Sequence, residues 1–148
     1  MITMAVPLIN IIMLEERKLQ EVMIGLAAGS FKFMAKEESA TMFKRARINE
    51  RALAQVLIRI LRRHLQPSTQ TPRIRRFTIE LAIWMMKVNH KNIQVFKSIG
   101  MEHEMEAVTE NVSEVESFNI FSGSVGRSRY TVTMQSLVEI ALNLLADE

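Results

Sequence analysis

The sequence predicts an all-α protein of one domain, on three observations. Apolar residues recur at intervals of three and four along almost the whole chain of 148 residues, and only 5 Gly and 3 Pro interrupt them. No stretch alternates apolar and polar residues, and the most strand-like piece, Ser117–Phe121, is short and isolated. With 48% apolar residues the chain can bury a core of its own. The absence of Cys excludes disulfide scaffolds, thiolate zinc sites, iron–sulfur clusters and Cys nucleophiles.

The first 14 residues are almost wholly apolar, and we interpret them as a buried helix. They are too few to cross a bilayer, which needs about 20 residues. They run directly into Glu15, Glu16 and Arg17 without a small-residue cleavage site, so neither a signal peptide nor an anchor is expected. We therefore expect no membrane span and an intracellular protein, cytoplasmic or nuclear.

Two helices are predicted between Arg17 and Leu65. The first, of about twenty residues, contains Gly25 and Gly29 one turn apart, which either admit a closely packed neighbour helix or are simply tolerated. The second is amphipathic, with an apolar stripe from Leu53 to Leu65, and ends at the loop that reaches Pro72.

Four more helices are predicted after this loop. Thr71 and Pro72 suit the start of a helix that is apolar nearly all round and should be the most buried element. Residues 89–99 form a brief helix closed by Gly100 in the left-handed conformation. Residues 101–112 form another helix. A Ser- and Gly-rich loop then leads to a closing helix.

An internal repeat is visible at an offset of 53 residues. It aligns Ala40–Lys44 with Ile93–Lys97 and Phe31 with Trp84. Each time a long helix leads to a short one and then to a third, and the third helices begin near Val6, Ile48 and Met101, at intervals of 42 and 53 residues. Armadillo and HEAT arrays use two or three helices in about 40 to 47 residues.

The segment from Arg75 to Met105 resembles the armadillo pattern: a basic start, spaced apolar positions, Asn92, an apolar pair, Gly100 and a further apolar helix. Residues 118–126 and the closing helix resemble the C-terminal part of uncharacterised plant armadillo-like proteins. In the first unit Arg47 stands where the second has Gly100. The resemblance implies a right-handed superhelix of about two to three stacked units that acts as a protein-binding surface, without catalytic residues. The single domain, 1–148, would comprise a partial first unit 1–14, a unit 15–66, a unit 72–112, a loop 113–131 and a closing helix 132–146.

Such units bury their faces only against neighbouring units, and terminal units normally carry polar caps. By this pattern we expect the chain to begin inside a unit. We therefore expect its apolar front end to dock on a partner or to self-associate through Val6, Ile9, Ile12 and Met13.

The net charge of +3 conceals an asymmetry. The stretch from Lys44 to Arg76 holds ten basic residues and one acidic residue, a net charge of +9, and the rest of the chain carries −6. We expect a basic helical face, either simply solvated or bound to an acidic protein partner, at Arg51, Arg59, Arg62 and Arg63. Binding of nucleic acid by the Lys44 to Arg76 stripe is the alternative, although no aromatic residue interleaves with it.

The sequence contains little that suggests catalysis, a metal or a cofactor. His64, His90 and His103 lie far apart, and Asp147 is the only Asp. The Ser122–Ser128 segment lacks the Lys and the spacing of a phosphate-binding loop. Trp84 and the Met residues are expected to fill the core. We therefore predict a non-catalytic scaffold or adaptor for protein–protein interaction.

Overall fold

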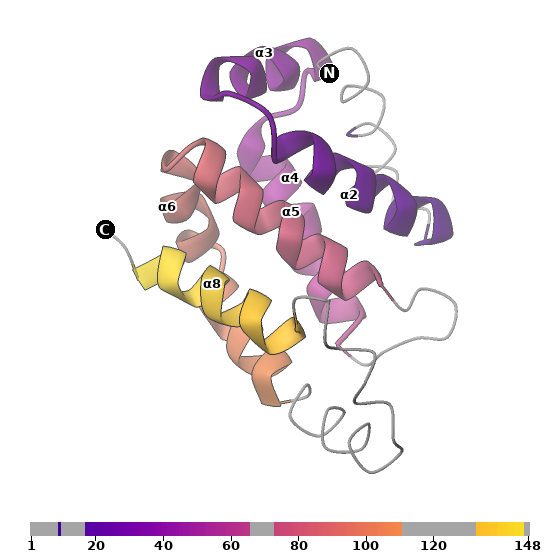
Figure 1. Cartoon of the computed structure of the whole chain (residues 1–148), viewed down its shortest axis with the longest axis vertical. Coiled ribbons are helices and arrows are strands. Elements are labelled where there is room, and N and C mark those ends of the chain that lie inside the picture. The colour runs from indigo at the N-terminus through magenta and orange to yellow at the C-terminus, as the bar shows by residue number, and fades with distance from the viewer. Residues whose placement is uncertain (1–8, 10–16, 66–72, 111–132, 147–148) are drawn as a thin grey trace.

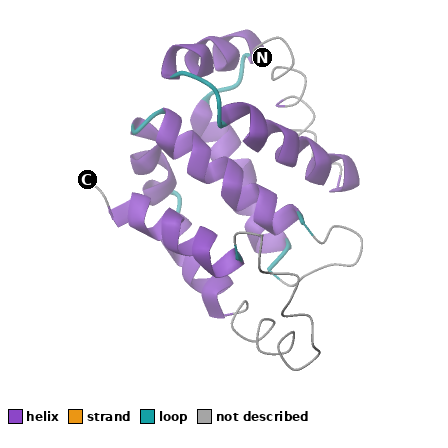
Figure 2. Ribbon diagram, viewed as in Figure 1, coloured by secondary structure: helices purple, strands orange, loops and turns teal. Residues whose placement is uncertain are grey.

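The computed structural model describes residue 9 and residues 17–65, 73–110 and 133–146. Every regular element in these ranges is an α-helix, which confirms the predicted fold class (Figure 2). None of the described helices is long and apolar enough to cross a membrane. The predicted loop 113–131 and the strand-like Ser117–Phe121 lie outside the described residues, as does most of the partial first unit 1–14.

The helices follow the predicted order of long, short and third helix, and this order occurs twice. The first set is α2 (Arg17–Phe31), α3 (Lys36–Ala46) and α4 (Glu50–Arg63). The second set is α5 (Ile74–Val88), α6 (Lys91–Ser98) and the helix over residues 101–110, and the chain closes with α8 (Met134–Ala146). The apolar spacing predicted the other described helices, whereas α3 was indicated only by the internal repeat, because spacing alone gave two helices between Arg17 and Leu65.

Hydrogen bonds from side chains fix where several helices begin. Asn49 caps α4, because its Oδ1 accepts the Ala52 N–H at 2.6 Å. Ahead of α5, the N-cap residue is Arg73 rather than Thr71, which lies with Pro72 outside the described residues. Arg73 makes no side-chain cap. Instead, Glu21 of α2 accepts the Arg73 backbone N–H at 2.8 Å, so a carboxylate from a different helix stands at this positive helix end.

The two sets also share the conformation of one joint. Gly100, between α6 and the helix that follows it, has a φ of +91°, which confirms the predicted left-handed residue. Arg47, between α3 and α4, is also left-handed, with a φ of 56°. The corresponding joint is therefore built in the same way in both sets, although a residue with a side chain pays steric strain there.

Helices α2, α5 and α8 lie side by side and run in the same direction, with α4 behind α5 (Figure 1). Helix α5 is central, since it packs against α2, α4, α6 and α8. Nine of its fifteen residues are buried, more than in any other described helix. This confirms the prediction that the helix apolar on all sides is the most buried one.

A polar cluster ties α4 to the start of α6. The Glu50 carboxylate accepts hydrogen bonds from the side-chain amides of Asn89 and Asn92. Asn92 is buried, and its amide also donates to the Met85 carbonyl at 2.9 Å. Asn92, which contributed to the armadillo resemblance, is thus occupied within the chain.

Candidate functional site

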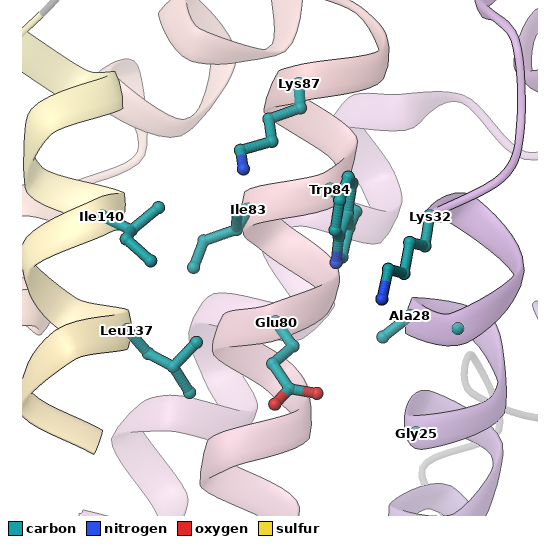
Figure 3. A pocket seen from close by; sticks show the side chains of 10 residues that line it. Gly25, Ala28, Lys32, Glu80, Ile83, Trp84, Lys87, Leu137 and Ile140 are labelled. Carbon is teal, nitrogen blue, oxygen red and sulfur yellow. The ribbon is translucent and has the colours of Figure 1, made fainter. Parts of the chain in front are cut away.

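A cavity of about 350 Å³ opens where α2, α5 and α8 meet, and we call it the three-helix cavity (Figure 3). Its volume lies at the lower end of the range of about 300–1,000 Å³ typical of ligand pockets. It opens to solvent, because Lys32, Lys87 and Ile140 on its rim are exposed. The residues that line it are Gly25, Ala28, Gly29, Lys32, Glu80, Ile83, Trp84, Lys87, Leu137 and Ile140.

The α2 wall of the cavity is formed by small residues. A Cβ at Gly25 would lie 2.9 Å from the Phe77 ring, so α2 and α5 approach more closely than a side chain would allow. This confirms, for Gly25, the interpretation of a closely packed neighbour helix. A Cβ at Gly29 would meet nothing within 4 Å. Gly29 therefore borders open space, and the helix packing does not require a glycine there.

The α5 wall carries Trp84, which is only half-buried and faces the cavity (Figure 3). The Lys87 Nζ lies 4.8 Å from the centre of the Trp84 ring, within the range of a cation–π contact. We predicted from the sequence that Trp84 fills the core, whereas the structure leaves it half-buried. Phe31, which the repeat aligns with Trp84, is buried. The alignment could not show which face of α5 is left uncovered by α8.

Charged residues stand at two ends of the three-helix cavity. Lys32, which directly follows α2, and Lys87 of α5 line the cavity on opposite sides of the Trp84 ring (Figure 3). Glu80 lies at the other end, and its Oε1 accepts a hydrogen bond from the Arg76 Nε at 3.2 Å. The negative charge is thus paired with a neighbouring cation, which leaves the two lysines to set the electrostatics of the opening.

The four arginines of the predicted basic face, Arg51, Arg59, Arg62 and Arg63, are all exposed. They belong to α4, behind α5 and away from the three-helix cavity (Figure 1). Arg62 is already engaged, because its Nε donates to the Glu104 Oε1 at 2.7 Å. The Glu104 side chain is only 7% exposed, against 57% for Arg62. Part of the attraction between the basic stretch and the acidic remainder of the sequence is therefore satisfied within one chain.

Arg75 differs from the expectation of a solvated basic stripe, because it is buried. Its Nη1 donates to the Leu65 carbonyl at 2.5 Å, at the C-terminal end of α4. Burial lowers the pKa of the Arg75 guanidinium from its usual value through desolvation. The exposed basic face within Lys44 to Arg76 therefore does not include Arg75, which instead links α5 to the residues that follow α4.

Of the apolar docking end predicted at the front of the chain, the structure describes one residue, Ile9. Ile9 is fully buried in the core of its own chain, so it presents no surface to a partner in this structure. Val6, Ile12 and Met13 lie outside the described residues. The sequence marks Ile9 as apolar, but it cannot show that the chain's own helices cover this side chain.

The described residues contain no group of three His, Asp or Glu side chains that could hold a metal ion. His64 is buried, whereas His90 and His103 are exposed. Asp147 and Ser122–Ser128 lie outside the described ranges. We therefore take the three-helix cavity as the candidate site.

Comparison with family models, with curated proteins and with solved structures finds no significant match to this chain. The site must therefore be interpreted from its own geometry.

Proposed function

We propose that this protein is a non-catalytic module for protein–protein interaction, built from armadillo-like units, that holds an extended segment of a partner in the three-helix cavity. The observation that carries this proposal is the cavity itself, at the junction of three helices that run in the same direction (Figure 1). The repeated helix order and the two left-handed joints support the stacking of similar units.

The lining of the cavity suits recognition. Ile83, Trp84, Leu137 and Ile140 can bury an apolar side chain, and the small residues of α2 allow a partner backbone to come close. The polar side chains are two lysines and a glutamate that is paired with Arg76. Such a set fixes the charge and the orientation of a ligand.

The test uses Trp84 as a reporter, since it is the only Trp in the chain. Peptides of random sequence are selected on the full chain by phage display, synthesised without Trp, and titrated while Trp84 fluorescence is recorded. Gly29→Leu fills open space and should weaken binding at least tenfold. Ala40→Leu places the same side chain on an exposed position of α3 and should leave binding unchanged. Circular dichroism verifies that both variants keep their helices. Peptides that bind Gly29→Leu as well as wild type would contradict the proposal.

Binding of nucleic acid through α4 is the second candidate function. Arg59 and Arg62 line a separate cavity of about 320 Å³ together with Gln55, Ile58 and Ile99. For this function, affinity for an RNA or DNA oligonucleotide must fall steeply with salt. Each lost phosphate contact would lower the log–log slope by about 0.7 to 0.9. The variant R51Q/R59Q/R63Q tests this and spares Arg62, which Glu104 needs. An unchanged slope in this variant removes the arginine face from consideration.

A further inference from the structure

We infer that the three-helix cavity selects an acidic segment of a partner protein, in which an Asp or Glu side chain pairs with Lys32 and Lys87 and a neighbouring apolar side chain lies against Trp84. This inference rests on the proposed function, because it names the chemistry of the segment that the cavity would hold.

The first support is the positive charge at the opening. Lys32 follows the end of α2, Lys87 lies in the last turn of α5, and both side chains are exposed. The Lys87 amino group lies on the side of the Trp84 ring toward α8, and the Lys32 amino group lies on the side toward α2 (Figure 3). Within the described part of the chain neither lysine has an ion-pair partner, and the carboxylate of Glu80 pairs with Arg76. An anion that enters the cavity therefore meets two cations and no free carboxylate on its described lining.

The second support is the Trp84 indole. Its ring nitrogen lies on the side that faces Lys32 (Figure 3). An indole N–H that is half-buried usually finds an acceptor, but the described residues supply none for it. The lining of the cavity thus includes two ammonium groups and an N–H donor. A carboxylate, which has two oxygen atoms and only accepts hydrogen bonds, matches this set of donors.

The third support distinguishes a carboxylate from a phosphate. Both lysines stand near the C-terminal ends of their helices, where the backbone carbonyls carry partial negative charge. That charge repels a phosphate dianion more than a carboxylate. Lysine also lacks the planar fork with which arginine binds phosphate in a bidentate manner. Next to the lysines, Ile83, Leu137 and Ile140 offer apolar surface, which suits a side chain of a peptide and not a sugar–phosphate backbone.

The experiment first determines the sequences of the selected peptides and then removes the lysine charges that are expected to bind them. Wild-type protein should enrich peptides with Asp or Glu beside Leu, Ile or Phe. Lys32→Gln combined with Lys87→Gln should lower the affinity for these peptides about tenfold, because two partly exposed ion pairs are lost. Lys44→Gln combined with Arg45→Gln removes the same charge from exposed positions on α3 and should leave affinity unchanged. Binding should also weaken as the salt concentration rises.

The outcomes separate this inference from the proposed function. If the selected peptides are neutral or basic but lose affinity for the Gly29→Leu variant, the acidic partner is ruled out while the cavity remains the binding site. If the selected peptides bind the Gly29→Leu variant as tightly as wild type, both the acidic partner and the proposed function are ruled out. Replacement of the peptide Glu by phosphoserine should weaken binding. If the phosphoserine peptide binds more tightly than the Glu peptide, the cavity does not prefer a carboxylate over a phosphate.

Discussion

The long helices of the two helix sets, α2 and α5, are buried to different extents. Helix α5 packs against four other helices, and its described side chains are buried on almost every face. Among the described helices, α2 packs chiefly on α5, and its Val22 and Leu26 are 50% and 53% exposed. Both helices show apolar residues at helical spacing, so the spacing indicates which residues can be buried. The number of neighbouring helices decides which ones are.

A pair of Leu→Ala substitutions tests this difference most directly. Leu81 on α5 is fully buried, so Leu81→Ala should lower the free energy of unfolding by about 3 kcal/mol through lost burial and a residual cavity. Leu26→Ala removes the same atoms from an exposed position and should cost less than about 1 kcal/mol. Urea denaturation followed by circular dichroism measures both values.

The contrast between the two units fails if Leu26→Ala destabilises the protein as much as Leu81→Ala. Such a result would mean that the outer face of α2 is covered in solution, by self-association or by another part of the chain. Repeating the denaturation at two protein concentrations separates these cases, because only self-association makes the midpoint concentration-dependent.

The two glycines of α2 give a smaller effect and locate the contact between the units. Gly25→Ala places a Cβ 2.9 Å from the Phe77 ring, and the overpacking should exceed the gain in helix propensity by about 1 kcal/mol. Gly29→Ala meets nothing within 4 Å and should stabilise the protein by up to about 1 kcal/mol. Thermal unfolding should therefore shift in opposite directions. A shift to higher temperature for Gly25→Ala would show that the two helices are farther apart than the structure has them.

Most of the helices were predictable from the spacing of apolar residues, which depends on local geometry, whereas the short α3 was indicated only by the internal repeat. Gly100 was predictable for the same reason, since a left-handed residue at a helix end favours glycine. The candidate site was only partly predictable. Gly25 and Gly29 suggested a close helix contact, but the exposed side of Trp84 depends on where α8 lies, after a long intervening segment.

Charge was the least predictable property. Arg62 and Arg75 have the same side chain, yet one is half exposed and paired with Glu104, while the other is buried against the Leu65 carbonyl. Which of them meets solvent depends on contacts between helices that are distant in sequence. A count of basic residues therefore indicates a basic stretch and not a basic surface.

The equivalent joints of the two helix sets include the smallest predicted effect, that of Arg47→Gly. Gly100→Ala should cost about 1–2 kcal/mol, because the left-handed conformation is strained for any side chain. Its Cβ would lie 3.7 Å from Arg62 Nη2, an ordinary contact, so the loss would report backbone strain alone. Arg47→Gly relieves the same strain but gives the unfolded chain more freedom, so the two terms nearly cancel and stability should change by less than about 0.5 kcal/mol.

Arg51→Gly is the matched control, since Arg51 is exposed inside α4, where glycine costs about 1 kcal/mol. The comparison of Arg47→Gly with Arg51→Gly in urea thus separates a left-handed position from a helical one. If both substitutions cost the same, Arg47 does not occupy the conformation of Gly100, and the two joints differ in backbone conformation. If Arg47→Gly is neutral while Arg51→Gly is costly, the first unit keeps the backbone of the second despite its different residue.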